Sequence, residues 1–154
     1  MRRLTVAGVF TAAVAVGALL FMTEPRTGAA QPAPDNRQQV VLPSMGRDMV
    51  LSEMRGMLAA VGDILRAVGA NDSAAAAKAA RVWGMAHAAD EKPELKRRLP
   101  PPFLQLGMKT HTAFDKIADA LDAGAPRDQV LGAMADLTAN CVACHAAYRI
   151  ESAR

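Results

Sequence analysis

The chain has 154 residues, of which 51% are hydrophobic and 21% charged, and its formal net charge is +3. The first 30 positions contain three of the 18 basic residues and one of the 15 acidic residues, so the remainder has a net charge of +1. That balance excludes the broad basic surface of a nucleic-acid-binding protein. The length after position 30 is that of one ordinary domain.

The first 30 residues have the pattern of a secretory signal peptide. Arg2 and Arg3 precede an uncharged apolar run over residues 4–22, and the small residues Gly28 and Ala30 favour cleavage after Ala30. We therefore expect the rest of the chain to be exported to the periplasm. The alternative is an anchor retained in the inner membrane and facing the periplasm, since the apolar run approaches the roughly 20 residues that span a bilayer.

The segment after this signal predicts a flexible lead-in followed by a helical domain. Residues 31–43 contain proline and glutamine without periodicity, and the domain is expected over residues 44–154. Its first helix is predicted over residues 44–69, because apolar residues recur there every three or four positions. This apolar stripe consists of Leu51, Met54, Leu58, Val61, Leu65 and Val68. Asn71, which tolerates a left-handed turn, follows the helix.

Three further helices are predicted along the rest of the chain. An alanine-rich segment predicts the second over residues 72–91, and KPELKRRLPPP then allows one helical turn at residues 94–98. The third begins near Pro102, which suits a first turn, and the fourth covers residues 126–152. No segment has the alternating pattern of a strand. We predict an all-α fold, an antiparallel up-down-up-down four-helix bundle.

The two cysteines of the chain lie in the fourth predicted helix, in the sequence NCVACHAAYR. Cys141, Cys144 and His145 are offset by three and four positions, so they project from one helix face, with the Cβ atoms of the cysteines roughly 5–6 Å apart. This separation suits thioether bonds to the two vinyl groups of one porphyrin, and His145 can then reach its iron. Cys-x-x-Cys-His is the attachment signature of c-type haem. We predict one haem c bound through Cys141 and Cys144.

Three other interpretations of the cysteine pair are weaker. A disulfide between residues one turn apart closes so short a loop that it stabilises little. A structural zinc site needs four ligands, and the missing one would have to come from His87 or His111, neither of which has a local partner at ligand spacing. A thioredoxin-type dithiol follows a strand at the start of a helix, whereas this motif is late in a helix.

The motif and its place near the C-terminus resemble the class II cytochromes c, the cytochrome c′ family. Members carry Cys-x-x-Cys-His-x-x-Tyr/Phe-Arg/Lys on the last helix, and CVACHAAYR matches this pattern, including Tyr148 and Arg149. The resemblance covers residues 45–150. It implies thioethers at Cys141 and Cys144, His145 as the proximal iron ligand, and Arg149 beside the haem on the proximal side. Tyr148 also continues the apolar stripe, so a packing role is left open.

The resemblance leaves two possibilities for the sixth iron ligand. Low-spin members supply a methionine from the first helix and carry electrons, and Met54 resembles that ligand. High-spin members have an apolar side chain there and bind small gases, and Leu51 resembles that residue. We prefer Met54, because it lies at the height of His145 in an up-down bundle. The less favoured candidates are Met57, Met49, His87 and His111, and we expect His111 to be a buried hydrogen-bond donor that could reach a haem propionate.

These features together predict an electron carrier. Methionine–histidine ligation closes the iron to other ligands, and the sequence shows no nucleophile–base pair or paired carboxylates at the haem end, so we expect no enzyme. The alternatives are a five-coordinate protein that binds nitric oxide or carbon monoxide, and a structural adaptor with an incidental motif. The expected partners are redox proteins, and we expect them to dock on a basic loop that contains Lys92, Lys96, Arg97 and Arg98. A homodimer is also expected, since dimers are common in the family that the chain resembles. No nucleic acid is expected.

Overall fold

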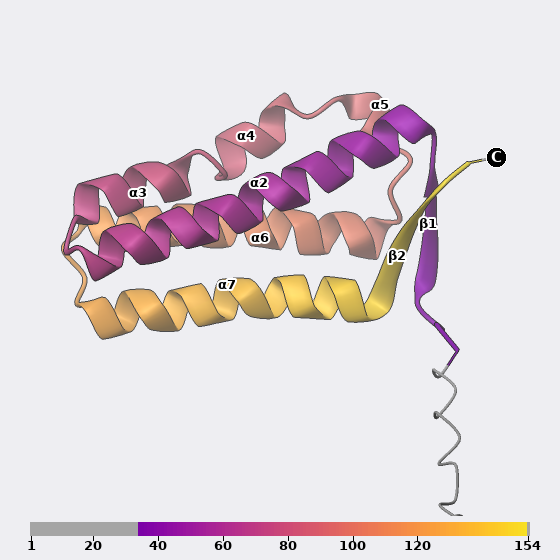
Figure 1. The fold of residues 1–154 in the computed structure, drawn as a ribbon. Helices are drawn as coiled ribbons and strands as arrows, with labels where there is room; N and C mark the ends of the chain where they lie inside the picture. The colour runs from indigo at the N-terminus through magenta and orange to yellow at the C-terminus, as the bar shows by residue number, and fades with distance from the viewer. Residues whose placement is uncertain (1–33, 154) are drawn as a thin grey trace, which may run out of the picture. The chain divides into compact units, whose positions relative to one another are not determined.

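The computed structural model describes residues 34–153 and is mostly helical. The predicted signal peptide and the first residues of the predicted lead-in lie outside this range. The elements in chain order are β1 (Gln38–Leu42), α2 (Ser44–Gly69), α3 (Ser73–Arg81), α4 (Met85–Asp90), α5 (Pro93–Lys96), α6 (Pro101–Asp122), α7 (Arg127–Ala147) and β2 (Tyr148–Ser152). Helix α3 packs against α2 and α6, and α6 packs against α7 (Figure 1).

Helix α2 has the bounds that the sequence predicts. Asn71, just after it, has a φ of 58°, the left-handed conformation expected at that position. The predicted apolar stripe divides in the structure, however. Val68 is buried in the protein core together with Ile64, whereas Leu65 is 44% exposed. The members of the stripe nearer the start of α2 contribute to the wall of a cavity, described below.

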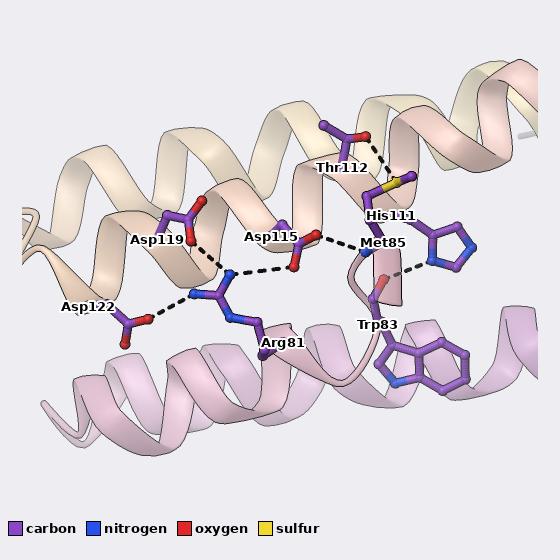
Figure 2. Close-up of polar contacts among 8 residues, drawn as sticks. All are labelled: Arg81, Trp83, Met85, His111, Thr112, Asp115, Asp119 and Asp122. Carbon is purple, nitrogen blue, oxygen red and sulfur yellow. Dashed lines mark hydrogen bonds and ion pairs between the residues drawn. The ribbon is translucent and has the colours of Figure 1, made fainter. Parts of the chain in front are cut away.

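The predicted second helix is broken into α3 and α4, which corrects the expectation of one continuous helix. It begins as expected, with the Asp72 side chain accepting a hydrogen bond from the backbone N–H of Ala75. The chain then turns away at residues 82–84. Figure 2 shows why: the Asp115 carboxylate accepts the N–H of Met85, and the Trp83 carbonyl lies against the His111 ring.

Glycine at position 84 permits this break. A Cβ atom at Gly84 would overlap the Asp115 carboxylate, and a Cβ atom at Gly56 of α2 would overlap the indole ring of Trp83. Arg81, at the end of α3, forms ion pairs with Asp115, Asp119 and Asp122 of α6 (Figure 2). The partners that end α3 and start α4 therefore come from α6, which is distant in the sequence.

Helices α6 and α7 follow the sequence prediction at their first residues. Proline begins α6, and Gly124, with a φ of 73°, ends the turn that separates α6 from α7. Among the described residues, α7 is the one helix that is long and apolar enough to cross a membrane by length and composition. Its buried residues Val130, Met134 and Leu137 belong instead to the core that it forms with α2, α3 and α6.

The C-terminal end of α7 differs from the prediction, because the helix stops at Ala147 and residues 148–152 form a strand. Strand β2 pairs in parallel with β1, which lies within the predicted lead-in (Figure 1). Alternate residues explain both strands: Val40 and Leu42 are buried, and Tyr148 and Ile150 pack against the same cluster. The pairing partner is more than 100 residues away, so no local pattern indicated it.

The apolar interior has two parts. The larger cluster fills the space among α2, α3, α6 and α7 around Phe114 and Ile117, both fully buried. The smaller cluster lies where β1, β2 and the first turns of α2 meet α5 and the start of α6. Cys144 and Met54 pack against this smaller cluster. The predicted site therefore lies at the strand end of the fold.

Candidate functional site

A cavity of about 560 Å³ lies at this end, within the range of small-molecule and cofactor sites. Its wall comes from α2, α6 and α7, with further residues from the segment that connects α4 to α6. Most of the lining side chains are apolar. The residues that the sequence predicts as a site and that line it are Met54, Cys141, Cys144 and His145, together with Leu51, Met57 and His111.

The α7 wall carries the cysteine motif on its last two turns. Helical spacing turns Cys141, Cys144 and His145 toward the same cavity, as expected from offsets of three and four. Both cysteines are free. Cys141 is exposed and Cys144 half-buried. Their partial burial raises the pKa of both thiols, and the neighbouring Cys141 raises that of Cys144 further. Reactive dithiols and metal-binding thiolates have lowered pKa values, so neutral thiols in this wall argue against a redox dithiol.

The structure also brings no zinc ligand to the cysteine pair. Within residues 34–153 there is no group of three or more histidine, cysteine or acidic side chains placed to hold a metal ion. His87 does not line the cavity. Its ring is tilted against that of Trp83, with centroids 4.5 Å apart, and stacks on that of His111, with centroids 5.9 Å apart. A four-ligand zinc site of the kind considered from the sequence is therefore not assembled in this part of the chain.

The α2 wall presents both candidates for the second axial position. Met54 and Leu51 line the cavity one turn apart, and Met57 lines it as well while packing against the larger cluster. Met49, the remaining methionine candidate, packs on the smaller cluster and does not line the cavity. The structure thus brings Met54 and the cysteine motif into one cavity, and it does the same for Leu51.

Two large apolar residues in the cavity wall are mostly exposed, although such side chains are usually buried. Leu58 of α2 is 71% exposed and Val142 of α7 is 69% exposed. Both line the cavity, and α2 and α7 make few direct contacts with each other. The stripe that the sequence assigned to the core therefore faces a space that protein atoms do not fill. Exposed apolar lining of this kind is typical of a ligand-binding cavity.

One side of the cavity is polar, and sequence reasoning missed it. Glu53 of α2, Glu91 at the end of α4 and His111 of α6 all line the cavity. Glu53 and Glu91 are neighbours, because Glu91 is one of the groups that raise the pKa of the Glu53 carboxyl, and His111 Nε2 lies 3.5 Å from Glu91 Oε1. Paired carboxylates are therefore present at this end, contrary to expectation. The three residues lie far apart in the sequence, so no local motif could have shown them.

His111 is 3% exposed, which confirms the expectation of a buried histidine. Both of its ring nitrogens have protein partners, because Nδ1 lies 2.8 Å from the Trp83 carbonyl oxygen and Nε2 faces Glu91. No ring nitrogen is left over for a propionate. Trp83 and Glu91 therefore account for the buried imidazole of His111 without the suggested hydrogen bond to a propionate.

Residues Tyr148 and Arg149, which strengthened the family resemblance, lie on β2 rather than on α7. Tyr148 packs edge-on against Phe103, with ring centroids 5.3 Å apart, in agreement with a packing role. Arg149 is not among the residues that line the cavity. Its guanidinium forms an ion pair with Glu151 at 3.0 Å, and its Nε is buried with no hydrogen-bond partner among the described residues.

The basic loop between α4 and α6 is less open than its sequence suggests. The Lys96 ammonium donates to the Ala88 carbonyl and lies 4.0 Å from Glu91 Oε2, so Lys96 is directed inward. Arg97 is exposed and pairs with Glu94 at 3.4 Å. Of the four expected docking cations, only Lys92, Arg97 and Arg98 are exposed.

Comparison of this chain with protein-family models, with curated proteins and with solved structures gives no match.

Proposed function

We propose that this protein is an exported c-type cytochrome of the class II type, in which α2, α3–α4, α6 and α7 form an antiparallel four-helix bundle around one covalently bound haem. One observation carries the proposal: a single, mainly apolar cavity of about 560 Å³ has Cys141, Cys144, His145 and Met54 in its wall. The residues present fit a c-type haem in their chemistry. Two neutral thiols one turn apart suit thioether formation, and an imidazole and a thioether sulfur suit the two axial positions.

In this proposal each of the predicted site residues in the cavity wall has a separate role in binding the haem. Cys141 and Cys144 would attach the haem through their sulfur atoms, and His145 and, from α2, Met54 would supply the two side-chain ligands to its iron. When bound, the haem iron supplies a one-electron couple whose potential methionine–histidine ligation raises. The apolar side chains of α2 and α6 that line the cavity would pack against the haem. The protein then passes single electrons between periplasmic redox partners.

A second candidate has one observation in its favour. Leu51 lines the same cavity one turn before Met54, and an apolar side chain over the iron would leave the sixth position open. The protein would then bind nitric oxide or carbon monoxide rather than carry electrons. The position of Arg149 beside the haem is supported only by the resemblance to the class II cytochromes c.

The test begins with the purified, exported protein. A haem that stays with the protein through acid–acetone extraction supports the attachment, and a colourless protein contradicts it. The ferric spectrum then separates the candidates. For the electron carrier we expect a low-spin spectrum that Met54→Leu converts to high spin, with new carbon monoxide binding.

Met57→Leu is the matched control, because Met57 lines the same cavity but packs against the larger cluster. We expect it to keep the low-spin spectrum. A wild-type protein that is already five-coordinate, or a Met57→Leu protein that alone loses the low-spin spectrum, removes Met54 from the site.

A further inference from the structure

Four titratable residues form a cluster at the polar side of the cavity, and electron carrying as proposed above does not use them. They come from four different elements: Glu53 from α2, Glu91 from the end of α4, Lys96 from α5 and His111 from α6. Glu53, Glu91 and His111 line the cavity. Placing two carboxylates beside an apolar cavity costs stability unless cationic or hydrogen-bonding groups lie next to them. A cluster of this kind is therefore a candidate for a functional role.

The contacts of the His111 ring favour a state in which the pair formed by His111 and Glu91 holds a proton. A backbone carbonyl only accepts, so the Nδ1 atom of His111, 2.8 Å from the Trp83 carbonyl oxygen, must carry a hydrogen (Figure 2). If the ring were neutral, the lone pair of Nε2 would then face the Glu91 carboxylate at 3.5 Å. That contact is attractive only when Nε2 or the carboxyl group is protonated.

The groups that face this pair favour the same protonated state. Burial alone would lower the pKa of His111, but Glu91, the carbonyl at Nδ1 and Glu53 outweigh it and raise that pKa. Burial would raise the pKa of Glu91, but His111, Lys96 and His87 outweigh it and lower that pKa. Burial and then Glu91 raise the pKa of Glu53. The proton therefore belongs to the imidazole, with Glu91 as its carboxylate partner.

We propose that the His111–Glu91 pair is a proton-binding site coupled to the redox state of the cavity, so that the protein takes up a proton with its electron. The proposal rests on the proposed function. On reduction, one electron arrives from a one-electron donor protein and one proton from solvent binds Nε2 of His111. On oxidation, the electron leaves to a one-electron acceptor and the proton returns to solvent.

Electrostatics and access both support this coupling. With the proposed haem in place, oxidation would add one positive charge to a cavity that His111 lines. As a general scale, a unit charge at roughly 10 Å and an effective dielectric constant of about 20 lowers the pKa of a histidine by about one. The proton has a route to solvent, because the Glu91 side chain is 12% exposed and the Lys96 side chain 25%. Salt screens such a buried interaction only weakly.

The test compares Glu91→Gln with Glu94→Gln, a matched control at an exposed acidic residue of α5 that does not line the cavity. The reduction potential of each holoprotein is measured between about pH 5 and pH 9, the range in which histidine titrates. We expect the potential of the wild type and of the control to fall with rising pH, by at most about 59 mV per pH unit. Glu91→Gln should flatten this slope. Titration of the haem propionates contributes equally in all three proteins, so it cannot account for a difference between their slopes.

A second measurement needs no variant. Photoreduction of the unbuffered wild-type protein with a pH-indicator dye should show uptake of protons from solvent, a substantial fraction of one proton per haem. Identical potential–pH curves for the wild type and Glu91→Gln, or a reduction without proton uptake, overturn the inference and leave the electron-carrier proposal intact. A protein that carries no covalent haem overturns both.

Discussion

Replacing both Cys141 and Cys144 by serine would separate the fold from its proposed cofactor. The cavity that the two residues line has a volume of about 560 Å³. At about 24 cal/mol per Å³, the value for cavities left in protein cores, an empty cavity of this size costs about 13 kcal/mol. That cost is as large as the whole unfolding free energy of a typical domain, about 5–15 kcal/mol. Water entering the open side lowers it, so the figure is an upper bound.

We therefore expect the double variant to lose the cavity end of the fold rather than hold it open. Of the 13 buried residues of the larger cluster only Phe114 and Leu137 line the cavity, whereas three of the five in the smaller cluster do: Val50, Leu95 and Phe103. Hydrogen exchange should accordingly become fast in β1, α5 and the first half of α2. Amides near Ile117 and Ile64, which belong to the larger cluster and do not line the cavity, should remain the best protected in the molecule.

The assay is chemical denaturation of the purified double variant, followed by circular dichroism, with haem content measured on the same sample. Ala143→Ser is the matched control, since it places the same hydroxyl between the two cysteines at an exposed position and should keep both the haem and the wild-type stability. A haem-free double variant that unfolds cooperatively, with a free energy within about 1 kcal/mol of the wild type, would refute the reasoning.

Two further predictions concern the break between α3 and α4 and the buried histidine. In thermal melts, Gly84→Ala should destabilise the protein by about 1–3 kcal/mol, because the new Cβ atom displaces the Asp115 carboxylate that caps α4. Gly132 of α7 has open space around it, so Gly132→Ala should stabilise the protein by about 0.5–1 kcal/mol in the same assay. The raised pKa of His111 contributes stability that is full below the ordinary value of 6.5 and is lost as the pH rises through the folded-state pKa. Urea titrations should therefore show wild-type stability falling as the pH rises above about 6.5. A His111→Gln protein with the same pH dependence contradicts this.

Local sequence was sufficient wherever the determining interactions are local. The ends of α2 follow from the period of its apolar residues and from Asn71, and the first residues of α3 and α6 follow from Asp72 and a proline. Helical spacing by itself directs the three residues of the Cys-x-x-Cys-His motif toward one side of α7, and the structure places all three at one cavity. These features depend on neighbours within about one helical turn.

Tertiary structure decided whatever depends on partners far along the chain. The segment after Ala147 is a strand because Val40 and Leu42 of β1 offer it a pairing partner and an apolar cluster. The second helix breaks because Asp115 satisfies the N–H group at the start of α4 and leaves no room for a side chain at Gly84. Burial also decides which members of an apolar stripe pack in the core and which line a cavity. Glu53, Glu91 and His111 come together only when α2, the end of α4 and α6 meet. A charged group beside an apolar wall costs less stability when an opposite charge lies next to it, as His111 does beside Glu91.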